Sequence, residues 1–138
     1  MSFDIFLKTA DDDVALDRAI AERAFDGIVE MMDYSEWMLL DPDGNPCDIA
    51  IDVLVDCIAV NRPPSFEAVP QFWNAMFEIL RQTRSFLIWS SAGPYPSYCI
   101  AHPELIVSPP PALLADFGKP AIVGSGAEID AAITRTGR

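Results

Sequence analysis

Histidine is almost absent from this sequence: His102 is the single one among 138 residues. Any Ser–His or Cys–His nucleophilic device must therefore use this one imidazole. Cys99 lies three residues before it, but tetrahedral zinc needs further ligands, and Cys47 and Cys57 show no ligand spacing to each other. We therefore expect no catalytic residues, no metal site and no cofactor.

Basic residues are also scarce. Nine Lys and Arg stand against 21 Asp and Glu, which gives a formal charge of −12. Phosphate backbones repel such a surface, so direct binding of nucleic acid is disfavoured. The same field would speed encounter with a basic protein, whereas solubility alone is the alternative explanation of the charge.

Long hydrophobic runs are missing as well. The longest, such as Phe86–Trp89, fall far short of the ~20 residues that span a bilayer. Met1–Phe6 lack the basic flank and apolar run of a signal peptide. The three cysteines are an odd and widely spaced set, which is typical of reduced thiols. These features predict a cytoplasmic protein without a membrane partner.

What the sequence does have is the composition of one globular domain. Apolar residues make up 51% of the chain, and no repeat or flexible linker divides it. Two alternating patterns predict strands, with Phe3, Ile5 and Leu7 on one face of the first and Asp4, Phe6 and Lys8 on the other. In the second, Ile49, Ile51, Val53 and Val55 share one face and Asp48, Ala50 and Asp52 the other. Asp43-Gly44 between apolar runs predicts a hairpin turn. The alternation slips near Cys57, where we expect a bulge or a turn into another short strand.

Apolar stripes of helical period predict two main helices, over about residues 12–26 and 69–83. A capping box at Thr9–Asp12 would begin the first, and Pro70 suits the first turn of the second. The other elements expected are strands near 85–91, 98–101 and 121–123, and short helices near 112–117 and 127–134. Hairpins outnumber crossovers, so residues 1–138 are expected to form one α+β domain. Its mainly antiparallel sheet of about 5–6 strands would carry the two main helices on one face.

Two partial motifs are rejected. Asp41, Asp43 and Asn45 imitate the start of a calcium loop, but Pro46 stands where that loop needs glycine. Gly124–Gly126 precede a possible helix but lack the Lys-Ser/Thr of a phosphate loop. A hairpin turn and a helix start account for these residues.

Aromatic residues gather around the turn that follows the central strand, and they predict a binding surface. Tyr and Trp combine contact area with a polar group, and a loop stiffened by proline loses less entropy when it binds. Inward packing of the same rings on the sheet is the alternative. The candidate partner- or ligand-binding residues are Arg62, Trp73, Trp89, Tyr95, Tyr98 and His102.

Several motifs spread over most of the chain carry a family resemblance. They are Met1–Phe6, Val60–Pro64, Phe72–Trp73 with Ile79–Thr83, Trp89, and Ser125–Ile129. On these motifs the chain resembles a loose group of small, uncharacterised bacterial proteins. In size, charge and lack of catalytic motifs it is also similar to immunity proteins, which bind and block a toxin. The resemblance supplies no site residue.

Three functional hypotheses follow, of which the sequence favours the first. The chain is a non-enzymatic acidic protein-binding domain, most concretely an immunity-type inhibitor of a basic toxin domain, anchored by Trp89, Tyr95 or Tyr98. Alternatively, it is a small-molecule binding or enzymatic domain with a pocket near Arg62, Trp89 and His102. A homodimer through a sheet edge or the second helix is the third.

Overall fold

The computed structural model describes residues 3–11, 14–51, 57–91, 93 and 97–136. The strands in these ranges are β1 (Asp4–Thr9), β2 (Glu30–Met31), β3 (Glu36–Leu40), β4 (Pro46–Ile51), β5 (Cys57–Asn61), β6 (Ser85–Trp89), β7 (Ser97–Ile100) and β8 (Ala121–Ile122). The helices there are α1 (Arg18–Ala24), α2 (Pro70–Gln82), α3 (Pro103–Val107), α4 (Pro111–Phe117) and α5 (Gly126–Thr136).

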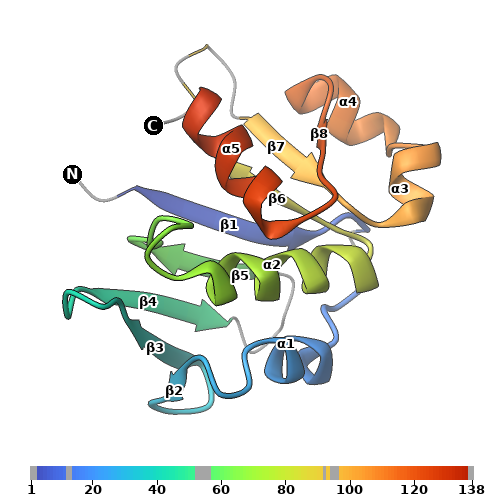
Figure 1. The fold of residues 1–138 in the computed structure, drawn as a ribbon. Coiled ribbons are helices and arrows are strands. Elements are labelled where there is room, and N and C mark those ends of the chain that lie inside the picture. Colours follow the sequence, from blue (N-terminus) through green and yellow to red (C-terminus); the bar gives the residue numbers. More distant parts are fainter. Residues whose placement is uncertain (1–2, 12–13, 52–56, 92, 94–96, 137–138) are drawn as a thin grey trace.

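The described strands form one sheet in the order β2-β3-β4-β5-β1-β6-β7-β8 (Figure 1). Each neighbouring pair is antiparallel, apart from the parallel pair β7 and β8. The α+β class is confirmed. The sheet is larger than predicted, with eight strands instead of about 5–6, because short edge strands such as β2 are too brief to show alternation in the sequence.

β1 lies inside the sheet, and its side chains alternate between a buried face and a partly exposed face. Ile5 and Leu7 are completely buried, and Leu7 pairs with Ile58 of β5 on one side and Leu87 of β6 on the other. Phe6 points to the opposite face, where it is partly exposed. The strand predicted from the first residues therefore packs in the core and pairs with a neighbouring strand on each side.

One face of the sheet is covered by α1, α2 and α5. The 13-residue helix α2 begins at Pro70 as predicted and contacts both α1 and α5. Its apolar stripe, which includes Phe72, Met76 and Leu80, is fully buried in the main core. Burial of this stripe, more than local helix propensity, holds α2 in place.

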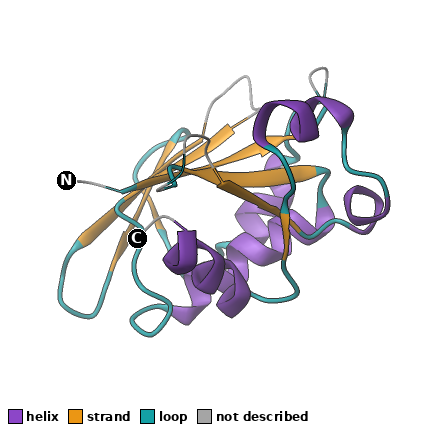
Figure 2. Cartoon of the chain, turned by 90° about the horizontal axis from the view of Figure 1, so that it is seen from above, coloured by secondary structure: helices purple, strands orange, loops and turns teal. Residues whose placement is uncertain are grey.

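The other face also carries helices, contrary to the one-sided arrangement predicted (Figure 2). Phe86 and Tyr98 form a second core with Leu105 of α3 and Leu113 of α4. The reason lies in β6, where Phe86 and Leu87 are adjacent and both buried, so both faces of this strand need an apolar cover.

The first helix is shorter than predicted. Helix α1 begins at Arg18, and the Asp17 carboxylate caps it by accepting from the Ala19 N–H at 3.0 Å. Thr9 of the predicted capping box instead ends β1. Asp11 instead forms an ion pair with Arg84, with 2.8 Å between Oδ2 and Nε. This contact between distant parts of the chain outweighs the local capping pattern.

The predicted hairpin is confirmed. Gly44 has φ of 82°, and the Asp41 carboxylate accepts from the backbone N–H groups of Asp43 and Asn45. The slip near Cys57 falls partly on residues 52–56, which lie outside the described residues, but Ile51 and Ile58 pair as antiparallel neighbours. No helix in the described ranges is long and apolar enough to span a membrane.

Candidate functional site

Three of the predicted binding residues are core residues. Trp89 and Tyr98 are each 2% exposed, and Trp73 is completely buried with its indole N–H donating to the Pro64 carbonyl at 2.9 Å. Rings that are this deeply buried cannot contact a protein partner. The alternative interpretation of the sequence, in which these rings pack inward on the sheet, is therefore correct for these three residues. Tyr95 lies outside the described residues.

The structure does not bring Arg62, Trp89 and His102 together. Arg62 follows β5 and forms an exposed ion pair with Asp48 at 3.2 Å. Trp89 pairs with Ser97 at the start of β7, whereas His102 lies beyond the opposite end of that strand. There its imidazole Nδ1 accepts from the Glu104 N–H at 3.2 Å and caps α3. The pocket predicted near these three side chains is therefore not formed by the described residues.

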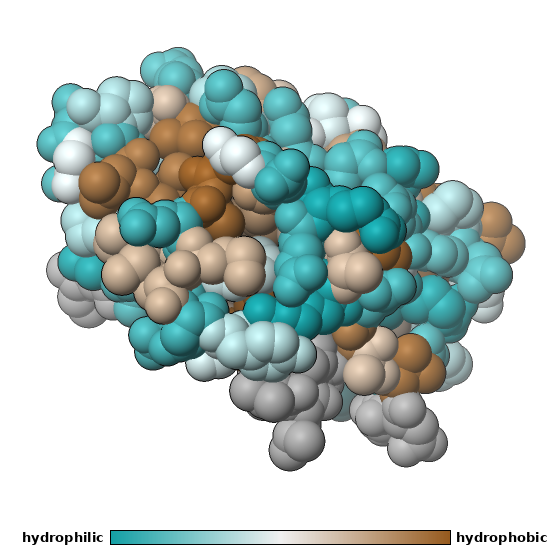
Figure 3. All heavy atoms as spheres, turned by 90° about the horizontal axis from the view of Figure 1, so that it is seen from below, coloured by the Kyte–Doolittle hydropathy of each residue, from teal (hydrophilic) through white to brown (hydrophobic). Residues whose placement is uncertain are grey.

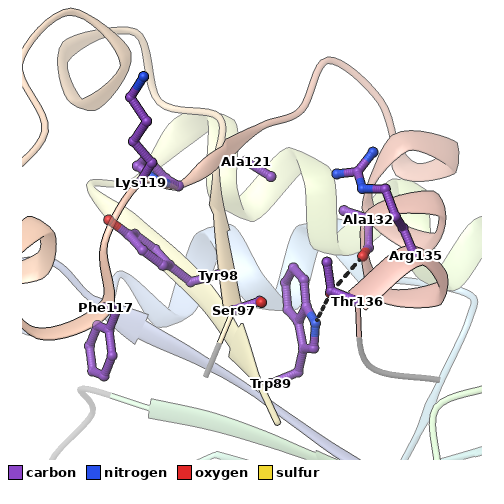
Figure 4. Close-up of a pocket in the computed structure, with 10 residues that line it drawn as sticks. Trp89, Ser97, Tyr98, Phe117, Lys119, Ala121, Ala132, Arg135 and Thr136 are labelled. Atoms are coloured by element: carbon purple, nitrogen blue, oxygen red, sulfur yellow. Dashed lines mark hydrogen bonds between the residues drawn. The ribbon is translucent and has the colours of Figure 1, made fainter. Parts of the chain in front are cut away.

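A different pocket, of about 380 Å³, opens beside Trp89 and Tyr98 (Figure 4). The ladder between β7 and β8 begins at Cys99, which leaves the edge of β7 at Ser97 and Tyr98 without a strand neighbour among the described strands. Helix α5 borders this gap on one side, and residues 117–121 border it on the other. Trp89 and Tyr98 thus belong to the walls of this pocket, although almost none of either ring is exposed.

Hydrogen bonds hold the walls of this pocket in place. The Trp89 indole N–H donates to the Thr136 hydroxyl at 2.8 Å, and that hydroxyl donates to the Ala132 carbonyl at 2.9 Å. The Tyr98 hydroxyl donates to the Gly118 carbonyl at 2.7 Å, and burial raises its pKa. The walls are therefore set before any ligand arrives, which lowers the entropy lost on binding.

The described residues that line the pocket are aromatic, small, hydroxyl-bearing or cationic. They are Trp89, Ser97, Tyr98, Phe117, Lys119, Pro120, Ala121, Ala132, Arg135 and Thr136. This set contains no histidine, cysteine or carboxylate that would form an acid–base or nucleophile–base pair. Its ionisable groups other than the tyrosine are the two cations.

A second candidate surface lies at the other end of the sheet, in α1, β2, β3 and β4. Residues 17–48 hold nine acidic and two basic residues, so more than half of the net charge of the chain falls on this segment, which we call the acidic edge. Met31, Met32 and Tyr34 are 56%, 57% and 59% exposed there. Figure 3 shows apolar side chains gathered on this side of the molecule, beside polar ones.

The turn between β2 and β3 holds Tyr34 outward. The Arg18 guanidinium lies 3.6 Å from the centroid of the Tyr34 ring and also bonds to the Tyr34 carbonyl. The Asp33 carboxylate accepts from the backbone N–H groups of Ser35 and Glu36, and these bonds lower its pKa. This surface was not predicted from the sequence. A signal was present, because Met31, Met32 and Tyr34 are apolar residues among acids and their spacing fits neither a strand nor a helix.

The three cysteines are free thiols, as expected from their spacing. Cys47 and Cys99 are buried, and Cys57 is partly exposed. Burial raises the pKa of the Cys47 thiol to about 12 and raises that of Cys99 further. Both buried thiols are therefore inert small apolar groups near neutral pH.

At pH 8 in native buffer, Ellman's reagent is expected to modify Cys57 and leave Cys47 and Cys99 unmodified until the chain unfolds.

The thiols of the unfolded chain ionise above a pH of about 8.5, while the buried thiols of the folded chain stay protonated. The free energy of unfolding should therefore fall as the pH rises above about 9, by about 1.4 kcal/mol per pH unit for each protonated thiol. Cys99→Ala should flatten that fall, and an unchanged slope would contradict the assignment.

Comparison with known proteins gives no assignment for this fold or for its two candidate surfaces. No family model, no curated protein and no solved structure matches the chain. In the part of the chain that the structure describes, no group of three or more His, Cys, Asp or Glu side chains is placed to hold a metal ion.

Proposed function

We propose that this protein is a non-enzymatic, acidic protein-binding domain, and most concretely an immunity-type inhibitor of a basic toxin domain. The observation that carries the proposal is the acidic edge, where Met31, Met32 and Tyr34 are exposed together among carboxylates. An apolar centre with a charged rim is the usual anatomy of a protein-binding surface.

The carboxylates of this edge are available to a partner. Glu30, Asp33 and Glu36 are exposed and form no ion pair with any described residue. Unpaired acids steer a basic partner and raise its association rate, whereas the apolar centre supplies most of the binding free energy. Methionine is flexible, so Met31 and Met32 are able to adapt to the shape of the partner.

The backbone at this edge adds a further means of recognition. β2 is the last strand on its side of the sheet, and its outer side has no strand neighbour among the described residues. A partner segment in extended conformation would continue the sheet through main-chain hydrogen bonds. β2 itself is only two residues long, so a partner strand would add only a few main-chain hydrogen bonds there to the contacts made by the side chains.

The first test is a pull-down from host lysate at about 50 and about 150 mM salt, followed by measurement of affinity with the purified partner. We expect one stoichiometric basic protein that is retained at the higher salt. The double variant Met31→Ala, Tyr34→Ala should weaken its binding about 30-fold or more, since hot-spot residues contribute about 2 kcal/mol or more. Val107→Ala, on an 86% exposed side chain of α3, is the matched apolar control and should bind like the wild type.

Charge is tested separately through the association rate. Glu36→Gln should slow association, with a larger effect at low salt and little change in the dissociation rate. Glu67→Gln removes the same charge from an exposed position outside residues 17–48 and should have a smaller effect. Equal binding by the wild type and the Met31, Tyr34 variant would place the partner elsewhere on the surface. Failure to capture any protein at either salt would contradict the proposed function, and a doubled mass in solution would indicate self-association instead.

A further inference from the structure

Two of the few cations of this acidic chain line the pocket beside Trp89. Four of the eight described Lys and Arg residues, Arg18, Arg62, Arg81 and Arg84, form ion pairs. Lys119 and Arg135 form none with any described residue, yet both line this one pocket. Each follows or ends a helix, and the helix dipole accounts for a cation at either place. It does not account for the presence of both cations at one pocket, where no described lining residue carries a carboxylate.

The two cations approach the pocket from opposite sides. The Arg135 side chain reaches from the last turn of α5 toward the space beside the Trp89 indole (Figure 4). Lys119 stands on the facing segment with its ammonium directed outward, and its exposed, flexible side chain needs no change of backbone to turn toward an anion. The Ser97 hydroxyl, on the edge of β7, has no hydrogen-bond partner among the described residues.

Aromatic rings supply the apolar part of the same pocket. Trp89, Tyr98 and Phe117 line it, and Tyr98 meets Phe117 edge to face with ring centroids 5.9 Å apart. The volume of about 380 Å³ falls in the range of small-molecule sites. Trp89 and Tyr98 are almost fully buried, so the apolar surface open to a ligand comes from half-buried residues such as Phe117 and Pro120, beside the exposed cations Lys119 and Arg135.

We propose that this pocket binds a small organic anion, with its carboxylate or phosphate held by Arg135 and Lys119 and its apolar part in the pocket between them. A guanidinium binds carboxylate and phosphate in a bidentate manner. The site lies outside the acidic edge and does not depend on the proposed protein partner.

The test follows the indole N–H signal of Trp89 by NMR while benzoate, phenyl phosphate and the neutral benzamide are added in turn. The signal is assigned with Trp89→Phe. We expect a saturable shift with at least one of the two anions, with a Kd of about 1 mM or tighter, and no comparable shift with benzamide. Whichever of benzoate and phenyl phosphate binds more tightly identifies the negative group as carboxylate or phosphate.

The variant Arg135→Gln should weaken the binding of the anion about tenfold or more, because a charge-assisted hydrogen bond is lost. Arg23→Gln is the matched control, since Arg23 is exposed on α1 and also lacks an ion pair among the described residues. Circular dichroism and the melting temperature check that both variants fold. The absence of a saturable shift with either anion, an equal response to benzamide, or wild-type affinity in Arg135→Gln would each overturn the proposal.

Discussion

Trp73→Ala is expected to lower the free energy of unfolding by about 3–5 kcal/mol, which is a large part of the stability of a domain of this size. The Trp73 ring is completely buried and meets Phe72 edge to face, with centroids 5.0 Å apart. Its indole N–H also donates to the Pro64 carbonyl and so ties α2 to the segment that follows β5. Truncation leaves a cavity and an unpaired buried carbonyl, and urea unfolding measures the sum of both effects.

Trp73→Phe separates the two contributions. Phenylalanine keeps most of the buried area but has no N–H, so the Pro64 carbonyl loses its donor at a cost of about 1–3 kcal/mol. Leu114→Ala, on a partly exposed side chain of α4, should change the free energy of unfolding by less than about 1 kcal/mol and serves as the control. A Trp73→Ala variant within about 1 kcal/mol of the wild type would show that the core tolerates the cavity and would contradict its role.

Gly126→Val is the second large effect expected, at about 1–3 kcal/mol or more. A Cβ at Gly126 would lie 2.6 Å from the Trp73 carbonyl carbon and 2.7 Å from the Asn74 backbone nitrogen. Both atoms belong to the backbone of α2, so they are unable to move aside as the end of a flexible side chain does. The glycine therefore permits the close approach of α2 and α5, and thermal or urea unfolding measures its loss.

The same substitution should affect the pocket, because α5 carries Ala132, Arg135 and Thr136. If α5 is pushed away from α2, the bond from the Trp89 indole to Thr136 lengthens, and the indole N–H signal should shift. Gly124→Ala is the matched control, since its Cβ would meet mainly the carboxylate of Glu128, at 3.1 Å, which is able to rotate. Equal stability of Gly126→Val and Gly124→Ala would exclude the close contact as the cause.

The elements predicted most accurately are those whose periodic patterns are long and uninterrupted. Pro70 and the stripe of buried residues that follows it located α2 within one residue at each end. Asp43-Gly44 located the hairpin between β3 and β4, because few residues accept the φ of the Gly44 position. In both cases the local conformational preference and the burial of the final structure point the same way.

Elements that depend on distant contacts were predicted less well. The capping pattern at Thr9–Asp12 is sound locally, but β1 extends to Thr9 by pairing with Ser85, and Asp11 binds Arg84. Helices α3 and α4 lie on the second face because β6 is buried on both of its faces. The apolar run in β6 indicates that both faces are covered, but it does not show which elements cover them. Tertiary pairing outweighed the local signal at each of these places.

The sequence by itself determined the class of fold, the acidic charge and the small, widely spaced set of cysteines. Only the tertiary structure decided which aromatic side chains face a pocket and which charges stand unpaired. Trp89 and Tyr98 lie on β6 and β7, whereas Lys119 and Arg135 come from segments 20 or more residues further along the chain. Side chains so far apart in sequence line one pocket because the pairing of β6 with β7 and the contact between α2 and α5 place them there. The local periodicity of the sequence carries no information about such distant contacts.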